Sequence, residues 1–171
     1  GYTEQELKDA GLVSEKGGRI YDRFRNRLMF PIIDVRGNVI GFGGRVMDDS
    51  TPKYLNSPET IIFNKRKNLF ALNLAKKSKL GYLILVEGYM DAIALYQYGF
   101  DCAVASLGTS LTPEHATLLS RYTEQVYLIY DADQAGPNAT RRALPMLEHG
   151  GIRTTVPKIP HSTDPDDLPT H

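Results

Sequence analysis

The sequence predicts an α/β protein whose second half is a parallel sheet flanked by helices. Runs of β-branched and aliphatic residues alternate there with stretches of helical spacing and length. Buried strands separated by such helices indicate right-handed βαβ crossovers. Expected strands are residues 83–87, 102–106, 126–130 and 152–156. Expected helices are 90–98, 137–149 and a segment that begins at Pro113 after a Thr112 cap.

The sequence predicts that residues 1–80 form a smaller, basic, mixed α/β subdomain, which precedes the subdomain of residues 81–171. Thr3 and Glu6 form a T-x-x-E capping box and Gly11 provides a stop, so a short helix is expected over 4–10. Further elements are expected from strand formers, turn residues and apolar spacing. They are strands 28–35 and 39–46, joined by a turn at 36–38, and an amphipathic helix over 68–79.

The glycines of GFGGR, residues 41–45, lie inside the second of these strands. No helix follows them, so a phosphate-binding glycine loop is not predicted. A bulge or a close approach of two backbones is expected instead.

The composition is that of an ordinary globular protein. The 171 residues are 42% hydrophobic and 23% charged, which excludes a disordered chain. No apolar run reaches the roughly 20 residues that cross a bilayer, so no membrane contact and a cytoplasmic location are expected. Cys102 is the only cysteine, which excludes an internal disulfide and a cysteine-based zinc site and predicts a packed thiol.

The formal net charge of zero conceals an asymmetry. Residues 19–67 hold ten Lys or Arg against five Asp or Glu, which leaves ten against fifteen elsewhere. A basic half beside an acidic half suits a protein that holds an anionic polymer next to a metal site. A solvated surface of mixed charge is the alternative.

Acidic residues follow the expected strands. Glu87 ends the first strand, Asp131 and Asp133 follow the third, and a TDPDDL segment with Asp164, Asp166 and Asp167 lies near the end. The carboxyl ends of parallel strands form the ligand-binding edge of an open sheet. Clustered carboxylates repel one another unless a divalent cation holds them together. The sequence therefore predicts a magnesium site, with a solvated turn and a charged loop as the alternatives.

Magnesium keeps several waters and shares its coordination shell with phosphates, so loosely grouped acids favour phosphate chemistry. Such a site can activate an attacking hydroxyl and stabilise a leaving pyrophosphate. Glu87 is then either a metal ligand or a general base. Thr109 and Ser110 are expected to cap a helix or to approach a phosphate, and His115 is expected at the surface or in packing.

Several motifs resemble a known family. VEGYMD (86–91) and DADQAG (131–136) resemble the toprim signature of primases, topoisomerases and some nucleases. Further segments narrow the resemblance to the catalytic core of bacterial DnaG-type DNA primases, over about residues 19–168. These segments are YDRFRNRLMFPI (21–32), GFGGRV (41–46) and TPKYLNSPET (51–60).

The resemblance implies a toprim-type parallel sheet and a set of site residues. Glu87, Asp131 and Asp133 are the implied catalytic residues. The same three with Asp164 and Asp166 are the implied metal ligands, and Asp91 is a further acid. The implied nucleotide- and template-binding positions are Arg23, Arg45, Lys53, Tyr54, Asn56 and Lys65.

The implied activity is that of a DNA-directed RNA polymerase that makes short RNA primers on single-stranded DNA from nucleoside triphosphates. The implied cofactor is Mg²⁺, for which Mn²⁺ can substitute, with no zinc in this segment. The family also contacts the replicative helicase through a domain that this sequence does not contain. Relative to the family pattern the zinc-binding segment and the helical bundle are missing, so weak or no primer synthesis by the chain alone is expected. A toprim nuclease and a non-catalytic metal- or nucleotide-binding module are the alternatives.

Overall fold

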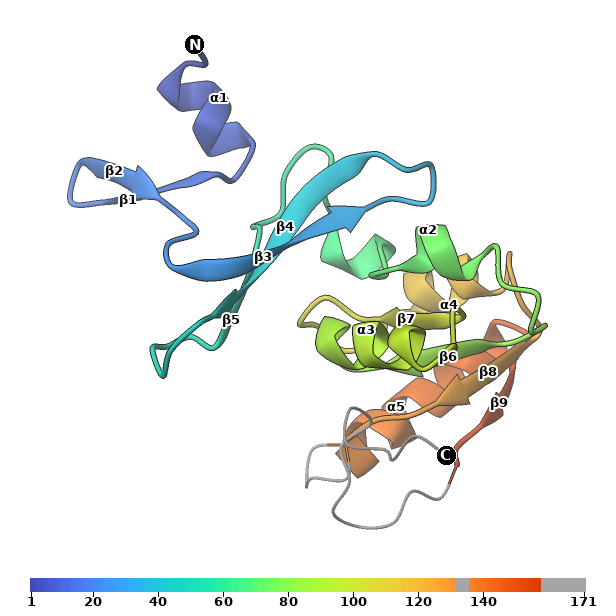
Figure 1. Ribbon diagram of the computed structural model, residues 1–171. Coiled ribbons are helices and arrows are strands. Elements are labelled where there is room, and N and C mark those ends of the chain that lie inside the picture. Colours follow the sequence, from blue (N-terminus) through green and yellow to red (C-terminus); the bar gives the residue numbers. More distant parts are fainter. Residues whose placement is uncertain (132–135, 158–171) are drawn as a thin grey trace. The chain divides into compact units, whose positions relative to one another are not determined.

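The structure, a computed structural model, describes residues 1–131 and 136–157 (Figure 1). Asp133, Asp164, Asp166 and Asp167 therefore lie outside the described residues. The chain divides into two compact units, Gly1–Asn64 and Lys65–His171. No helix among the described residues is long and apolar enough to cross a membrane.

The first unit is a mixed α/β structure with two antiparallel sheets. A β1–β2 hairpin forms one sheet, and the other has the order β3-β4-β5. The predicted capping box is confirmed, because Glu6 N donates to Thr3 Oγ1 at 3.3 Å and Thr3 N donates to Glu6 Oε2 at 2.7 Å. The elements are α1 (Glu4–Asp9), β1 (Val13–Lys16), β2 (Arg19–Asp22), β3 (Arg27–Ile33), β4 (Val39–Val46) and β5 (Tyr54–Asn56).

The β1–β2 hairpin was not predicted from the sequence. Gly17 and Gly18 both have positive φ, 59° and 74°, and form the two-residue loop between Lys16 and Arg19. Turns with two positive φ angles match the twist of paired strands. Both strands are largely exposed, so they lack the apolar alternation that makes a strand visible in a sequence.

The glycines of β4 permit a close approach of side chains to the strand, and not the close approach of two backbones that the sequence predicted. A Cβ atom at Gly41 would lie 3.2 Å from Phe63 Cδ1, and one at Gly44 would lie 3.0 Å from Arg27 Cδ. The β3–β4 register also shifts between Ile32 and Ile33, which confirms a bulge in this strand pair.

The second unit contains a parallel sheet, as predicted, and its strand order is β7-β6-β8-β9. Helix α3 packs on β6 and β7, and α5 packs on β9 and α4. The strands are β6 (Leu83–Val86), β7 (Ala103–Ala105), β8 (Gln125–Leu128) and β9 (Arg153–Thr155). The helices are η1 (Lys65–Lys67), α2 (Leu72–Ala75), α3 (Tyr89–Gln97), α4 (Pro113–Leu119) and α5 (Gly136–His149).

The predicted helix over 68–79 is wrong for most of its length, since only α2 is α-helical. The backbone of Phe70 instead forms a bridge with Ala105, donating to its carbonyl at 2.8 Å and accepting from its N–H at 3.2 Å. Ala71 then takes a left-handed φ of 62°, which an α-helix excludes. This bridge ties the segment to β7, and the division into two compact units falls after Asn64.

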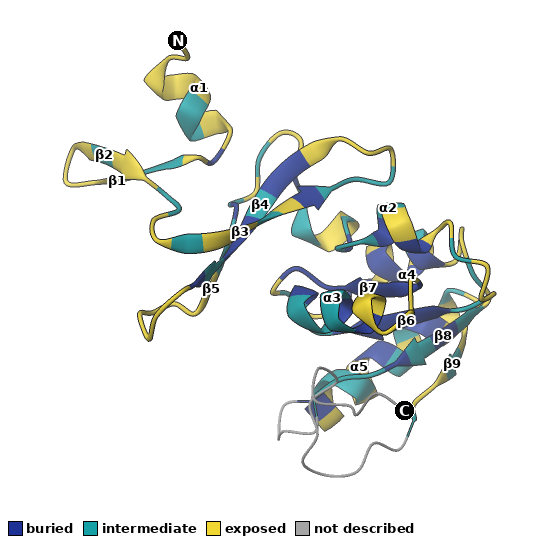
Figure 2. Ribbon diagram, viewed as in Figure 1, coloured by how far each residue is buried: buried dark blue, intermediate teal, exposed yellow. Residues whose placement is uncertain are grey.

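The core of the second unit is centred on β6, whose residues are all buried (Figure 2). Leu85 and Leu128, which pair across β6 and β8, are both 0% exposed. Burial on both faces of these strands explains why the sequence shows continuous apolar runs.

Replacing Leu85 by Ala should lower the free energy of unfolding by about 3 kcal/mol, because it removes packed methyl groups and leaves a cavity. Leu74→Ala is the matched control, since Leu74 is 44% exposed, and should change stability by less than about 1 kcal/mol. Urea unfolding of both variants measures the difference. Equal losses would contradict the placement of the core at β6.

Candidate active site

The structure places Glu87 and Asp131 at the same edge of the parallel sheet. Glu87 directly follows β6, and Asp131 lies three residues beyond the end of β8, the neighbouring parallel strand. The chain passes from β6 to β7 on one side and then to β8 on the other, so the strand order reverses above β6. Open α/β sheets bind ligands at such a reversal. We call Glu87 and Asp131 the acidic edge.

The turn after Glu87 is held by two hydrogen bonds. Ser106 Oγ, at the end of β7, donates to the backbone carbonyl of Glu87 at 3.0 Å. The backbone N–H of Gly88 donates to Asp91 Oδ2 at 3.1 Å, across the first turn of α3. Asp91, predicted as a further acid, thus has a structural role in orienting the chain that carries Glu87.

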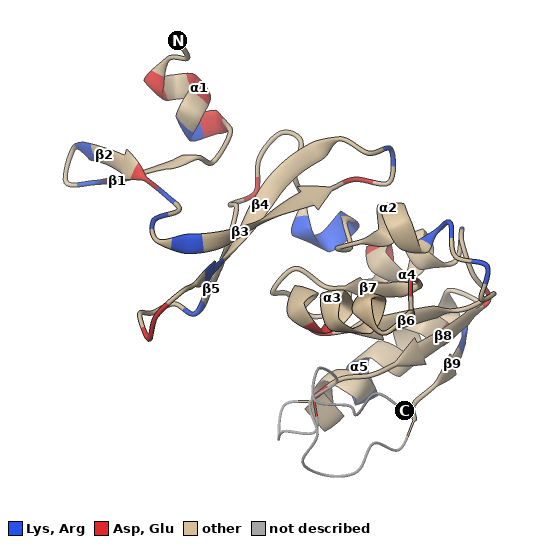
Figure 3. Cartoon of the chain, in the orientation of Figure 1, with Lys and Arg blue, Asp and Glu red and all other residues tan. Residues whose placement is uncertain are grey.

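Several of the predicted basic positions lie together in the first unit. Arg45 on β4 and Tyr54 on β5 are cross-strand partners, with the Arg45 guanidinium 6.0 Å and the Lys53 ammonium 5.8 Å from the Tyr54 ring centre. Arg23 donates to the Asn56 carbonyl at 2.8 Å through Nη2. These contacts hold cationic side chains on the β4–β5 strand pair. Lys65 instead belongs to the second unit, in η1, which is seen as a continuous basic segment in Figure 3.

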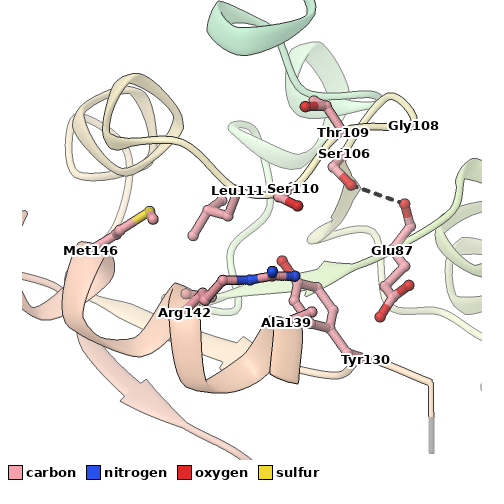
Figure 4. A pocket seen from close by; sticks show the side chains of 11 residues that line it. Glu87, Ser106, Gly108, Thr109, Ser110, Leu111, Tyr130, Ala139, Arg142 and Met146 are labelled. Atoms are coloured by element: carbon pink, nitrogen blue, oxygen red, sulfur yellow. Dashed lines mark hydrogen bonds between the residues drawn. The ribbon is translucent and has the colours of Figure 1, made fainter. Parts of the chain in front are cut away.

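A pocket of about 430 Å³ lies beside Glu87 within the second unit (Figure 4). The residues from Ser106 to Leu111 form one wall, and α5 forms another. Burial, and then the negative charge of Glu87, raise the pKa of Tyr130 well above its usual value, so its hydroxyl stays protonated near neutral pH. The lining residues are Glu87, Ser106, Gly108, Thr109, Ser110, Leu111, Tyr130, Ala139, Arg142, Ala143 and Met146.

Arg142 was not identified from the sequence, although it brings a cation to this pocket. Its guanidinium extends from α5 towards Tyr130 and the Glu87 side of the pocket (Figure 4). The ion pairs found among the described residues, Lys8–Glu15 and Arg66–Glu114, do not involve it. The available signal was its helical spacing with Ala139, Ala143 and Met146, which also line the pocket, although Arg142 itself is largely exposed.

The acidic edge fits a hard divalent cation that needs few protein ligands. Among the described residues no group of three His, Cys, Asp or Glu side chains is close enough to hold a metal. The carboxylates of Glu87 and Asp131 offer oxygen ligands at neighbouring strand ends. Mg²⁺ typically uses one or two carboxylates and completes its shell with water and phosphate.

Family models match both halves of the chain. Residues 1–76 match the N-terminal domain of the DNA primase catalytic core, and residues 84–169 match the Toprim-like family. The chain belongs to the toprim-containing DNA primase family. Toprim domains and primases generally use a divalent metal ion.

Relatives within the primase family cover nearly all of the chain. A DNA primase of Clostridium acetobutylicum is 56% identical over 169 residues, which are 98% of this chain and 28% of the relative. A primase domain from Pseudomonas aeruginosa has a TM-score of 0.90 at 46% identity, over 96% of this chain and 53% of that one. A DnaG catalytic domain solved with single-stranded DNA has a TM-score of 0.88 at 50% identity, over 96% of this chain and 53% of that one. The chain thus spans about three-tenths of its curated relative.

Proposed function

We propose that the chain forms the nucleotidyl-transfer part of a DNA primase, which makes short RNA primers on single-stranded DNA from nucleoside triphosphates. The observation that carries this proposal is the acidic edge at the strand reversal above β6, beside a pocket with a cationic wall. The DNA-bound relative supports a nucleic-acid template as the partner. Because the bacterial chromosome lies in the cytoplasm, such an enzyme works there.

Glu87 and Asp131 are proposed to hold the metal, with Asp133, Asp164 and Asp166 as further ligands outside the described residues. The proposed ion is Mg²⁺, for which Mn²⁺ can substitute, and it would activate the attacking hydroxyl and stabilise charge on the leaving pyrophosphate. This requires oxygen ligands at the sheet edge, which the two described carboxylates provide.

Glu87 is proposed either to hold the metal or to accept the proton of the attacking primer hydroxyl. In both cases its carboxylate must be oriented, and the Ser106 and Asp91 hydrogen bonds fix the peptide group that joins Glu87 to Gly88. Arg142 is proposed to pair with phosphate oxygens, and the protonated Tyr130 hydroxyl can donate to the same group.

The proposed nucleotide- and template-binding residues are cationic or polar. Lys and Arg pair with phosphate, and a tyrosine ring can stack on a base. Contact with the replicative helicase is proposed for a further domain of the longer protein. The residues are Arg23, Arg45, Lys53, Tyr54, Asn56 and Lys65.

The test compares ribonucleotide incorporation with DNA cleavage, both with Mg²⁺ and a single-stranded template. A version of the chain extended at both ends to the length of its relatives should incorporate ribonucleotides and should not cleave. Cleavage without incorporation would favour the toprim nuclease alternative. The chain alone should synthesise primers far more slowly, and equal rates for both lengths would contradict that expectation.

Replacing Arg142 by Ala in the extended version should lower kcat/KM by about 30-fold, because a lost charge-assisted hydrogen bond costs about 2 kcal/mol. Arg142→Lys keeps the charge but not the guanidinium's fork of donors. Its kcat/KM should lie between those of Arg142→Ala and the wild type. Arg141→Ala is the matched control, since Arg141 is exposed as Arg142 is but does not line the pocket. Its kcat/KM should stay within about twofold of the wild-type value. Similar losses in both alanine variants would show that Arg142 has no special role in the site.

A further inference from the structure

The turn η1 concentrates three cations, Lys65, Arg66 and Lys67, in one turn of 3₁₀ helix. Consecutive like charges repel one another, and so short a turn has few hydrogen bonds of its own. Arg66 forms an ion pair with Glu114 at 3.9 Å, between largely exposed side chains. A pair of this kind contributes little, so other contacts must hold the turn. We call residues 65–67 the basic turn.

Buried side chains at the start of α4 hold the backbone of the basic turn. Thr112 Oγ1 donates to the Arg66 carbonyl at 2.7 Å. His115 Nε2 lies 2.8 Å from the Lys65 carbonyl oxygen and 3.0 Å from that of Asn68. Thr112 is 5% exposed and His115 is 0% exposed. Two side chains from one helical turn thus bind three carbonyl groups in and just after the basic turn.

The hydrogen-bond pattern fixes the tautomer of His115. Its Nδ1 accepts the backbone N–H of Thr112 at 3.2 Å, so Nδ1 carries no hydrogen. The hydrogen is therefore on Nε2, which donates to the two carbonyl groups. Burial lowers the pKa of His115, which keeps the ring neutral. A neutral His115 therefore adds no positive charge beside the cations of the basic turn.

The other end of the segment is fixed to the strand that supports Glu87. Phe70 pairs with Ala105 on β7, and the next residue, Ser106, donates to the Glu87 carbonyl. The basic turn and Glu87 are therefore anchored to the same part of the second unit, through α4 and β7.

We infer that Thr112 and His115 are positioning residues, which hold the basic turn so that its cations bind the phosphate groups of a template strand or a nucleotide. The identity of this ligand rests on the proposed function, whereas the anchoring of the turn does not. Neither side chain is inferred to touch the ligand, because both act on it through the backbone of residues 65–68.

Replacing His115 by Asn or by Gln distinguishes the hydrogen bond that Nδ1 accepts from those that Nε2 donates. An Asn side chain can place an acceptor near the position of Nδ1 but does not reach the carbonyl groups of the turn. A Gln side chain can place a donor near the position of Nε2. His115→Asn should therefore release the turn, and His115→Gln should keep it. Thr112→Val removes, at nearly the same shape, both the donor to Arg66 and the acceptor that caps α4 at the His115 N–H, and Thr112→Ser keeps both.

The measurement is equilibrium binding of an oligothymidylate to the chain at several salt concentrations, with Mg²⁺. The slope of log affinity against log salt should shrink by about 0.7 for each phosphate contact that is lost. His115→Asn and Thr112→Val should each lose one to two such contacts and about 5- to 20-fold in affinity. His115→Gln, Thr112→Ser and the exposed control His149→Asn should keep the wild-type slope. Parallel titration with a nucleoside triphosphate shows whether the template, the nucleotide or both contact the turn.

Thermal unfolding of every variant separates positioning from a loss of folded protein. Two results would overturn the inference: unchanged slopes in His115→Asn and Thr112→Val, or losses that follow the melting temperature in all variants, His115→Gln included. If His115→Asn does not fold, Thr112→Val and Thr112→Ser carry the same comparison. Failure to incorporate nucleotides, with the slope changes present, would count against the proposed function and not against this inference.

Discussion

Glu87→Gln should reduce primer synthesis by the extended protein by about 10²- to 10⁴-fold, while binding of template and nucleotide stays within about threefold. Gln has nearly the shape of Glu, so the turn held by Ser106 and Gly88 should persist. It carries no negative charge for a cation and cannot accept a proton at neutral pH. Losses of this size are typical when a group that takes part in proton transfer is removed. Incorporation rates and binding constants, measured on the same preparation, test the expectation.

Metal dependence distinguishes the two roles proposed for Glu87. If it is a ligand, a higher Mg²⁺ concentration should restore part of the rate of Glu87→Gln, and if it is a general base the rate should stay low. Glu124→Gln is the matched control, because Glu124 is exposed and precedes β8, at the opposite end of the neighbouring strand. That variant should behave as the wild type. Full activity in Glu87→Gln would leave only a binding role for the acidic edge.

Gly136→Ala should lower the affinity for the divalent cation by about 10- to 100-fold and the free energy of unfolding by about 1 to 3 kcal/mol. A Cβ atom at Gly136 would lie 1.7 Å from the backbone oxygen of Asp131, which no packing permits. The backbone around Asp131 must therefore move, and with it one carboxylate of the acidic edge. Isothermal titration with Mn²⁺ and urea unfolding measure the two effects.

Gly150→Ala provides the control for the loss of a glycine at the opposite end of α5. Its Cβ atom would meet the Leu147 oxygen at 3.3 Å, a contact that small shifts can relieve. This variant should bind Mn²⁺ as the wild type does. An unchanged Mn²⁺ affinity in Gly136→Ala would show that the position of Asp131 does not matter for the metal.

The parallel sheet could be predicted because its strands β6 and β7 are buried on both faces. The residues of β6 are all apolar, and Gly88 and the Thr112–Pro113 cap mark the helices that follow β6 and β7. The same pattern predicted that Glu87 and Asp131 lie at one edge of the sheet, and the structure adds that the strands before them are neighbours. Their chemical roles, and those of Asp133, Asp164 and Asp166, remain predictions.

Other features depend on contacts between distant residues, which periodicity does not reveal. The amphipathic pattern over 68–79 predicted one long helix, but a bridge to Ala105 breaks it at Phe70. His115 was expected at the surface or in packing, and packing is confirmed. Its hydrogen bonds reach residues about 50 positions earlier in the chain, and no local pattern indicates them. The position of Arg142 beside the pocket could not be predicted either, because the opposite wall, from Ser106 to Leu111, is distant in the sequence.

The bridge between Phe70 and Ala105 also affects how the protein behaves at high concentration. β7 lies at one end of the strand order, where an uncovered strand offers N–H and carbonyl groups to a second molecule. Phe70 uses both such groups of Ala105, the last residue of β7, on the side that β6 leaves open. The segment that carries the basic turn thereby also protects the sheet from aggregation by strand pairing.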